Sequence, residues 1–319
     1  MINSKIITLI KESANIIILS HIAPDGDSIG SSLALLSALK KWDKNVKFVL
    51  DDEVPEIYKF LVGADKVEKP CNNDTFDLVI VLDSGDINRL GKSAKYLNNK
   101  NIINIDHHVS NTSFGTHNII DSNAAATAEL VYLVIKALSI EIDKNIAECL
   151  YTGIVTDTGQ FQYSNTTSVT HSIAGDLINC GVNPSKLYRK IYQSNTKEKM
   201  KLIGEAIDSL EFYLDDKISC ITINKEQFDE IGAKDEDADG IINFARDIST
   251  VEVALFFREN SDGKVKVGFR SKDYIDVNVV AEQFGGGGHK RAAGATIAGN
   301  IDIVKEQVIK RLIELFMVG

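Results

Sequence analysis

The sequence is poor in cysteine and contains no long apolar run. Its four cysteines, Cys71, Cys149, Cys180 and Cys220, lie far apart and form no Cys-x-x-Cys pair. This spacing predicts small buried apolar residues rather than zinc ligands or disulfide partners, as in a reducing compartment. No apolar run approaches the roughly 20 residues that a membrane-spanning helix needs, and the first residues lack a signal-peptide pattern. We therefore expect a cytoplasmic protein with no membrane partner.

The chain also lacks an excess of basic residues. Its formal net charge is -10 at pH 7, whereas proteins that grip long duplex nucleic acid through many phosphates are basic. An anionic substrate is still compatible with this charge, because metal ions and a few cationic side chains can supply positive charge locally. The 319 residues, 44% hydrophobic and 25% charged, suffice for two globular domains with a core each.

Short apolar runs alternate with helical patterns through the N-terminal half. This alternation predicts an α/β domain with a mainly parallel sheet. The predicted strands are residues 15–20, 46–50, 76–82 and 101–106, and the predicted helices are 55–62, 86–97, 124–138 and 143–153.

Carboxylates and imidazoles gather where these elements end. Because ligands bind at the carboxyl edge of open α/β sheets, we expect the side chains to share one pocket. Each motif alone has a simpler explanation: adjacent histidines occur by chance on surfaces, and an Asp-Gly-Asp sequence is typical of a turn, here with Ser28 as the helix N-cap. The candidate residues are His21, Asp25, Asp27, Asp83, Asp106, His107, His108 and Asp157.

Five carboxylates in one pocket repel one another strongly unless cations lie among them. Mixed oxygen and imidazole ligands suit manganese, iron, cobalt or zinc better than calcium. So many ligands predict two metal ions, roughly 3.5–4 Å apart, that share a bridging carboxylate, which is an arrangement used for phosphoester hydrolysis.

The motifs together resemble those of the DHH phosphoesterases in order and approximate spacing. They are His21-x-x-x-Asp25-x-Asp27, Asp83, Asp106-His107-His108 and Thr156-Asp157-Thr-Gly. The resemblance implies that His21 and Asp25 hold one metal ion, that Asp27, His107 and Asp157 hold the other, and that Asp83 bridges them. It implies that His108 contacts the scissile phosphate or acts as an acid, with Asp106 supporting the histidines. The implied cofactors are two divalent ions, Mn²⁺ first, with Mg²⁺ or Co²⁺ as alternatives.

The C-terminal half predicts a second, smaller α/β domain. We assign residues 1–185 to the DHH catalytic domain, 186–204 to a helical connector and 205–319 to the substrate domain. Helices are predicted at 167–180, 184–210, 225–232, 238–248 and 277–284, and strands at 211–215, 218–224, 251–258 and 264–270.

Four consecutive glycines, Gly285 to Gly288, precede His289 in this half. Because such a run is costly in conformational entropy, it predicts a close approach of the backbone, with amides that bind an anion; an exposed linker is the alternative. The stretch resembles the DHH-associated substrate domain, and Arg291 departs from the small or polar residue usual at its position. The resemblance implies that a terminal nucleotide is held by Arg270, Ser271, Gly286, Gly287, Gly288 and His289.

Short members of the family resemble this chain in length. The resemblance implies two-metal hydrolysis of short oligoribonucleotides, which releases 5′-mononucleotides, and removal of the 3′-phosphate from 3′-phosphoadenosine 5′-phosphate. Expected partners are short RNA oligomers, dinucleotides and that bisphosphate, and a homodimer is left open. The alternatives are a phosphodiesterase of linear or cyclic dinucleotides, a RecJ-type single-strand exonuclease, a family II pyrophosphatase and a non-catalytic nucleotide-binding module.

Overall fold

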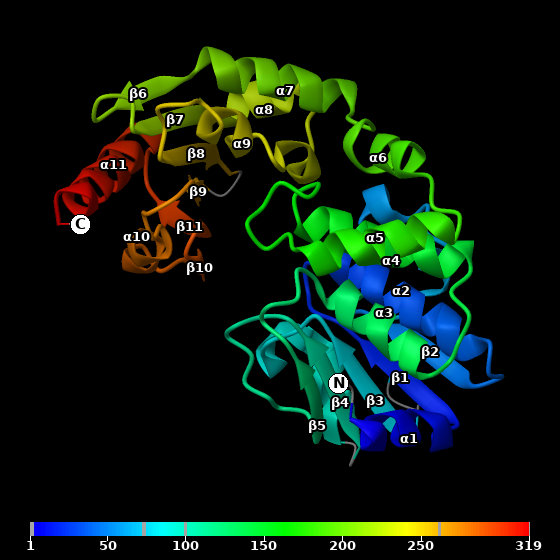
Figure 1. Cartoon of the computed structure of the whole chain (residues 1–319). Helices are drawn as coiled ribbons and strands as arrows, with labels where there is room; N and C mark the ends of the chain where they lie inside the picture. The colour runs from blue at the N-terminus through cyan, green and yellow to red at the C-terminus, as the bar shows by residue number, and fades with distance from the viewer. Residues whose placement is uncertain (1–2, 72–74, 99–100, 261–262, 319) are drawn as a thin grey trace. The chain divides into compact units, whose positions relative to one another are not determined.

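The computed structural model describes residues 3–71, 75–98, 101–260 and 263–318. The chain divides into two compact units, Met1–Ser194 and Asn195–Gly319 (Figure 1). Each unit has its own sheet and its own helices. Among the described residues, no helix combines the length and the apolar character needed to cross a membrane.

The first unit contains a five-stranded sheet in which all strands are parallel, in the order β2-β1-β3-β4-β5. The parallel α/β architecture predicted from the sequence is confirmed. The edge strand β5 was not predicted, because its four residues are only partly buried. The strands are β1 (Asn15–Leu19), β2 (Asn45–Val49), β3 (Leu78–Leu82), β4 (Ile102–Asp106) and β5 (His117–Ile120).

Helices cover one face of this sheet and a 3-10 segment covers the other. In β1, Ile16 and Ile18 pack into the helical layer, whereas Ile17 and Leu19 face the opposite core, as the alternation of side chains along a strand requires. Figure 1 shows α2, α3 and α4 side by side on the first face. The helices are α1 (Ser4–Glu12), α2 (Gly26–Lys40), α3 (Thr127–Ala137), α4 (Lys144–Asp157), α5 (Ser168–Asn179) and α6 (Pro184–Tyr192), and the 3-10 segments are η1 (Glu56–Tyr58), η2 (Ala64–Lys66) and η3 (Ile87–Asn98).

The helices α2 and α4 approach each other closely. A Cβ atom at Gly30 of α2 would lie 2.4 Å from the carbonyl oxygen of Cys149 in α4. Only glycine permits backbones to come this near. This close packing places Asp27 at the start of α2 in the same neighbourhood as Asp157 at the end of α4.

The second unit contains a mixed six-stranded sheet in the order β10-β11-β9-β8-β7-β6, in which only β7 and β8 pair in parallel. One face packs against α10 and α11 and the other against α7 and α9. The strands are β6 (Glu211–Tyr213), β7 (Ile218–Ile223), β8 (Val253–Glu259), β9 (Lys264–Ser271), β10 (Gly287–His289) and β11 (Ala292–Ala298). The helices are α7 (Lys197–Asp208), α8 (Lys225–Ile231), η4 (Asp235–Ala238), α9 (Ile242–Arg246), α10 (Asn278–Gln283) and α11 (Ile301–Val318).

The long helix predicted over 184–210 is two helices, α6 and α7. A new helix begins after Thr196, whose side chain accepts a hydrogen bond from the backbone N–H of Lys199. The predicted connector therefore spans part of α6, which lies in the first unit, and part of α7, which lies in the second. The helix predicted over 238–248 is shorter because Gly240, with a φ of 80°, precedes it.

Candidate metal centre

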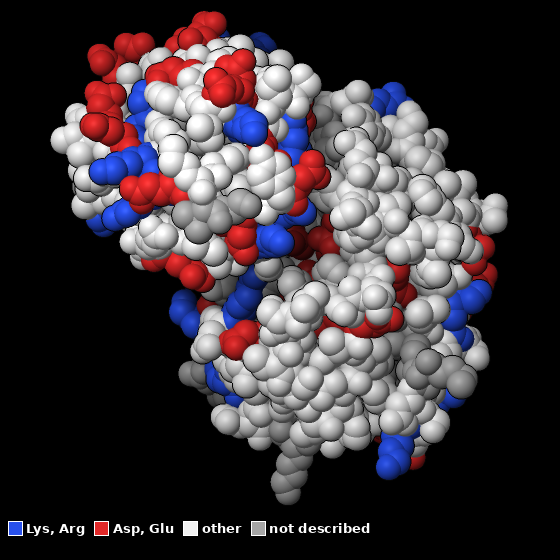
Figure 2. All heavy atoms as spheres, turned by 60° about the vertical axis from the view of Figure 1, so that its left-hand side comes forward, with Lys and Arg blue, Asp and Glu red and all other residues white. Residues whose placement is uncertain are grey.

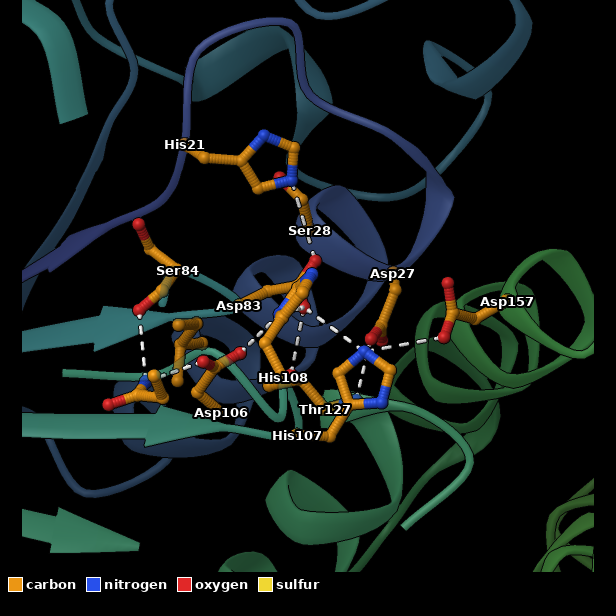
Figure 3. Close-up of polar contacts among 12 residues, drawn as sticks. His21, Asp27, Ser28, Asp83, Ser84, Asp106, His107, His108, Thr127 and Asp157 are labelled. Atoms are coloured by element: carbon orange, nitrogen blue, oxygen red, sulfur yellow. Dashed lines mark hydrogen bonds and ion pairs between the residues drawn. The ribbon is translucent and has the colours of Figure 1, made fainter. Parts of the chain in front are cut away.

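Acidic and imidazole side chains meet in three groups at the carboxyl edge of the first sheet (Figure 3). In each group, the candidate ligand atoms lie within 4.8 Å of one another. Two of the groups share no residue, namely His21, Asp25 and Asp83, and Asp27, His107 and Asp157; a third group, Asp83, His107 and His108, overlaps both. The structure thus brings together side chains that follow β1, β3 and β4 with side chains from the start of α2 and the end of α4. The two separate groups contain the residues that the family resemblance assigned to each metal ion.

Asp83 lies between the two groups. Its Oδ2 atom is 3.5 Å from Nε2 of His21, and its Oδ1 atom is 3.7 Å from Nε2 of His107. The residue directly follows β3 and has a φ of 57°, a left-handed conformation that is unfavourable for a residue other than glycine. A carboxylate with one oxygen facing each group has the geometry of a bridging ligand.

Backbone carbonyls orient the two ligand histidines. Nδ1 of His21 lies 2.7 Å from the carbonyl oxygen of Ile22, and Nδ1 of His107 lies 3.2 Å from that of Ala124. A proton on Nδ1 that is donated to a carbonyl leaves the lone pair on Nε2, the nitrogen that faces the carboxylates. This arrangement is typical of metal-binding histidines.

Asp27 is held by the N-terminus of α3. Its two carboxylate oxygens accept hydrogen bonds from the backbone N–H groups of Thr127, at 2.6 Å, and Ala128, at 2.9 Å. Asp25 is the N-cap of α2 and accepts from the N–H groups of Asp27 and Ser28. The prediction of Ser28 as N-cap was wrong, because the N-cap is Asp25, three residues earlier, and Ser28 lies within α2.

The protonation of the pocket reflects its excess of negative charge. Burial and neighbouring carboxylates, Asp83 first, raise the pKa of Asp27 well above its usual range. Burial, with the charges of nearby carboxylates, also raises the pKa of Asp157 to about 7. Burial alone would lower the pKa of His21, but contacts with Asp25 and Asp83 raise it to about 10. The pocket therefore gathers protons unless another cation neutralises it.

These donors fit divalent metal ions. Carboxylate oxygens and imidazole nitrogens converge in sets of three, both ligand histidines have a fixed orientation, and the bare pocket favours protonated carboxyl groups. A divalent ion would replace those protons with a charge that several carboxylates can share.

His108 has a different environment from His107. Its Nδ1 atom lies 2.7 Å from Oδ1 of Asp106, and this hydrogen bond raises the pKa of His108. Burial opposes the ionised form of Asp106, but hydrogen bonds from His108 and Asn111 hold its pKa below the usual range. The pair therefore favours an imidazolium beside a buried carboxylate.

Three residues with contacts in this pocket were not predicted as site residues. The Thr127 hydroxyl donates to Oδ1 of Asp83 at 3.0 Å, the Asn111 amide donates to Asp106, and Nη2 of Arg89 lies 3.2 Å from Nδ1 of His21. Asn111 follows the Asp-His-His motif closely enough to have been considered. Nothing in the local sequence linked Thr127 or Arg89 to residues more than 40 positions away.

The predicted substrate residues lie in the second unit. Arg270 is half-buried on β9, and Gly287 to His289 form the exposed edge strand β10. Ser271 is buried and its hydroxyl donates to the carbonyl oxygen of Ile275 at 2.7 Å. Since neighbouring residues of a strand point to opposite faces, the Ser271 side chain does not share the face that carries Arg270.

The glycine run is paired rather than a free linker. β10 pairs with β11. A Cβ atom at Gly286 would lie 2.2 Å from the carbonyl oxygen of Gly294, and one at Gly288 would lie 2.4 Å from the carbonyl oxygen of Ala292. The close backbone approach predicted for the run is therefore present, between two segments of the chain itself. Arg291, whose role the sequence left open, donates to the carbonyl oxygen of Lys272.

Each of the two units contains a match to a family model. Residues 15–154 match the family model described as "DHH family, N-terminal domain", and residues 221–317 match the "DHHA1 domain". Among the metal-site candidates, Asp157 lies three positions beyond the first match.

Similar proteins cover nearly the whole chain. A relative from Thermus thermophilus, named "Bifunctional oligoribonuclease and PAP phosphatase NrnA", is 34% identical and covers 94% of this chain and 89% of its own. A relative of the same name from Bacillus subtilis is 30% identical and covers 88% of this chain and 89% of its own. The crystal structure of an exopolyphosphatase-related protein from Bacteroides fragilis has a TM-score of 0.91 at 27% identity, and covers 98% of this chain and 94% of its own.

Proposed function

The chain belongs to the DHH family of metal-dependent phosphoesterases, and on this premise we propose that it hydrolyses short oligoribonucleotides to 5′-mononucleotides and removes the 3′-phosphate from 3′-phosphoadenosine 5′-phosphate. The observation that carries the proposal is the position of Asp83, with one carboxylate oxygen toward each ligand histidine. The names of relatives that match over most of the chain support the choice of substrate.

The site binds divalent metal, and we propose two ions, with Mn²⁺ as the first candidate. His21, Asp25 and Asp83 would hold one, and Asp27, His107 and Asp157, together with Asp83, would hold the other. Bound ions would polarise the phosphoryl oxygens of the substrate. The hydrogen bonds that hold Asp27 and the two histidines fix these ligands before a substrate arrives, so little ordering remains to be done during the reaction.

We assign the proton donor to His108. Asp106 occupies Nδ1 of the imidazole and favours its charged form, so Nε2 is the nitrogen that would donate a proton to the leaving oxygen. A group of this kind typically contributes 10²- to 10⁴-fold to the rate. Asp106 acts through His108, because its carboxylate is fully buried.

For the second unit, we propose that Arg270, His289 and the backbone of Gly286, Gly287 and Gly288 contact the substrate. A cavity of about 660 Å³ in this unit is lined by Arg270 and Gly286 among others, and its volume suits a nucleotide. Ser271 is proposed as a positioning residue for the end of β9, since its hydroxyl is used within the fold.

The surface offers little support for a long-strand nuclease. On the face drawn in Figure 2, blue Lys and Arg side chains are scattered among red Asp and Glu and wide uncharged areas, and the described residues of this face form no continuous basic band. Binding of long single strands uses a basic groove along the backbone. We also propose a cytoplasmic location, which suits the free thiols of Cys149, Cys180 and Cys220. Mass measurement in solution decides whether a homodimer forms.

The substrate panel is the direct test. With Mn²⁺ present, we expect release of mononucleotides from a labelled RNA dimer and trimer, and of phosphate from 3′-phosphoadenosine 5′-phosphate. Turnover of 24-residue RNA, cyclic dinucleotide and pyrophosphate should be much slower, as followed by chromatography. A preference for cyclic dinucleotide or pyrophosphate would replace our assignment with that alternative.

Asp83→Asn tests the site in the same assay. We expect it to lower hydrolysis by about 100-fold or more, because a bridging ligand is lost, and to reduce the bound metal measured by elemental analysis. The matched control is Asp86→Asn, three residues further along the same loop, which removes a carboxylate outside both ligand groups. Equal activity in Asp83→Asn and the control would refute the bridging role.

A further inference from the structure

Two glycines occupy interior strands of the second sheet without a need that the fold itself imposes. Gly268 of β9 and Gly294 of β11 pair directly across the two strands. A Cβ atom at Gly268 would have its nearest neighbour at 3.5 Å, and one at Gly294 at 3.6 Å, both ordinary contact distances. Glycine weakens a strand interior, and there it often marks close approach by a ligand. Something other than chain packing therefore accounts for these residues.

Gly286 and Gly288 show the contrasting case. Cβ atoms there would fall 2.2 and 2.4 Å from backbone oxygens of β11, so the pairing of β10 and β11 itself requires glycine. At Gly268 and Gly294, a Cβ atom would make only ordinary contacts, with the Ile242 side chain and the oxygen of Val267, and both positions are at least partly exposed, so the strand pairing does not require glycine there.

Both glycines line the 660 Å³ cavity. The floor of the cavity is formed by three residues that pair across neighbouring strands: Phe256 of β8 pairs with Gly268 of β9, and Gly268 pairs with Gly294 of β11. We call such a row of paired residues a rung of the sheet. The wall is formed by residues of η4 and α9, including Ile242. All these residues belong to the second unit.

Cationic side chains lie on the rungs on either side of this floor. Arg270 lies two residues from Gly268 in one direction and Lys266 two residues in the other, so the two positions are roughly 13 Å apart along the strand. Lys266 and Arg258 both contact Asp235, at 2.9 and 3.1 Å, which compensates charge at that end. Arg270 pairs with Ala292, which in turn pairs with His289, so the two side chains that the proposed function assigns to substrate contact lie at the same level of the sheet, and the phosphate is placed at that end.

We propose that Gly268 and Gly294 form a flat floor on which the base of the substrate nucleotide lies, with its phosphate toward Arg270. The proposal deepens the proposed function and rests on it for the class of ligand. A bare backbone surface beside an aromatic residue accepts the face of a planar ring, and a methyl group at either glycine would lift the ring off the floor.

The test compares Gly268→Ala and Gly294→Ala with the wild-type chain, all as full-length protein. Adenosine 5′-monophosphate is titrated calorimetrically in the presence of chelator, and ribose 5-phosphate serves as the probe without a base. We expect both variants to bind the nucleotide about 10-fold or more weakly, to bind ribose 5-phosphate as the wild type does, and to melt at an unchanged or higher temperature.

Gly204→Ala is the matched control, because a Cβ atom on this residue of α7 would meet nothing within 4 Å. It should melt at an unchanged or higher temperature and bind both probes normally. Gly286→Ala should melt at a lower temperature, since the fold needs that glycine.

Several results would overturn the floor: wild-type nucleotide affinity in both variants, equal weakening of the two probes, a loss of stability like that of Gly286→Ala, or no nucleotide binding by the wild-type chain. The proposed activity can fail independently of this proposal. If the wild-type chain hydrolyses no RNA dimer but both glycine variants still bind the nucleotide more weakly, the glycine floor is supported and the assigned reaction is refuted.

Discussion

At the scale of single residues, the hydrogen-bond partner of each histidine at the metal centre decides its chemical role. His107 and His108 are neighbours in sequence, yet the carbonyl of Ala124 orients the first and the carboxylate of Asp106 orients the second. A carbonyl partner of Nδ1 turns Nε2 of His107 toward the carboxylates of the pocket, whereas a buried carboxylate on Nδ1 of His108 favours the imidazolium. The different partners of Nδ1 thus give two adjacent histidines different chemistry.

Asp106→Asn tests this division through pH. The Asp106 carboxylate raises the pKa of His108, so the substitution should lower that pKa. Because a proton donor must be protonated to act, His108 in the variant should lose its activity at a lower pH. We expect the falling alkaline limb of kcat to move to lower pH, with kcat at pH 8 reduced about 10- to 100-fold. The measurement is kcat against pH on an RNA dimer at saturating Mn²⁺.

Asn111→Ala is the control for this experiment. It removes a hydrogen bond to Asp106 but keeps the carboxylate charge, so the alkaline limb should move less. If kcat fell equally at every pH in Asp106→Asn, His108 would not be the group that titrates.

At the scale of elements, the packing of α2 against α4 sets the width of the metal pocket. Asp27 is in the first turn of α2 and Asp157 is the last residue of α4, so the spacing of the helices decides whether both carboxylates can reach one ion. The helix α2 is buried on almost every side, between the sheet, α3 and α4, and has little room to shift.

Gly30→Ala should therefore act on both stability and metal binding. The added Cβ atom would overlap the carbonyl oxygen of Cys149, which forces the helices apart at a cost of about 1–3 kcal/mol. We expect a lower free energy of unfolding in urea and weaker Mn²⁺ binding by calorimetry.

The comparison for this variant is Gly175→Ala in α5, where a Cβ atom would meet nothing. That change should stabilise the protein by up to about 1 kcal/mol and leave metal affinity unchanged. If Gly30→Ala bound Mn²⁺ normally despite a loss of stability, helix spacing would not control the site.

At the scale of the whole molecule, folding and metal binding are linked through charge. Folding brings into one pocket carboxylates that repel one another, and protons or metal ions must compensate them. The fold of the first unit therefore carries a cost in its metal-free form, and that cost depends on pH.

The sign of this dependence follows from the pKa values. The pKa of Asp157 rises from 3.8 in the unfolded chain to about 7 in the folded chain, and the pKa of His21 rises from 6.5 to about 10. Both groups hold more protons in the folded state, so their contribution to stability decreases as pH rises through these ranges. The lowered pKa of Asp106 acts in the opposite direction, but below about pH 4.

We expect the metal-free protein to melt at a progressively lower temperature between pH 5.5 and 8.5. Mn²⁺ should raise the melting temperature more at pH 8.5 than at pH 5.5, because protons compete with the ion at low pH. Scanning calorimetry with chelator and with Mn²⁺ measures both curves. Parallel curves with and without metal would show that these groups do not take part in metal binding.

The sequence alone determined the architecture of the first unit and the identity of the residues at its edge. Isoleucine- and valine-rich runs such as Ile102 to Ile105 favour buried parallel strands, and β4 ends in Asp106 at the carboxyl edge of the sheet, where ligands bind. Local signals of this kind depend on a few neighbouring residues, which is why they can be recognised in the chain itself.

Only the tertiary structure decided how these residues work together. That Thr127 binds Asp83, that the carbonyl of Ala124 orients His107, and that Gly268 pairs with Gly294 all depend on segments far apart in the sequence. The physical reason is that hydrogen bonds and close backbone approaches are made between surfaces that exist only after the strands and helices have packed.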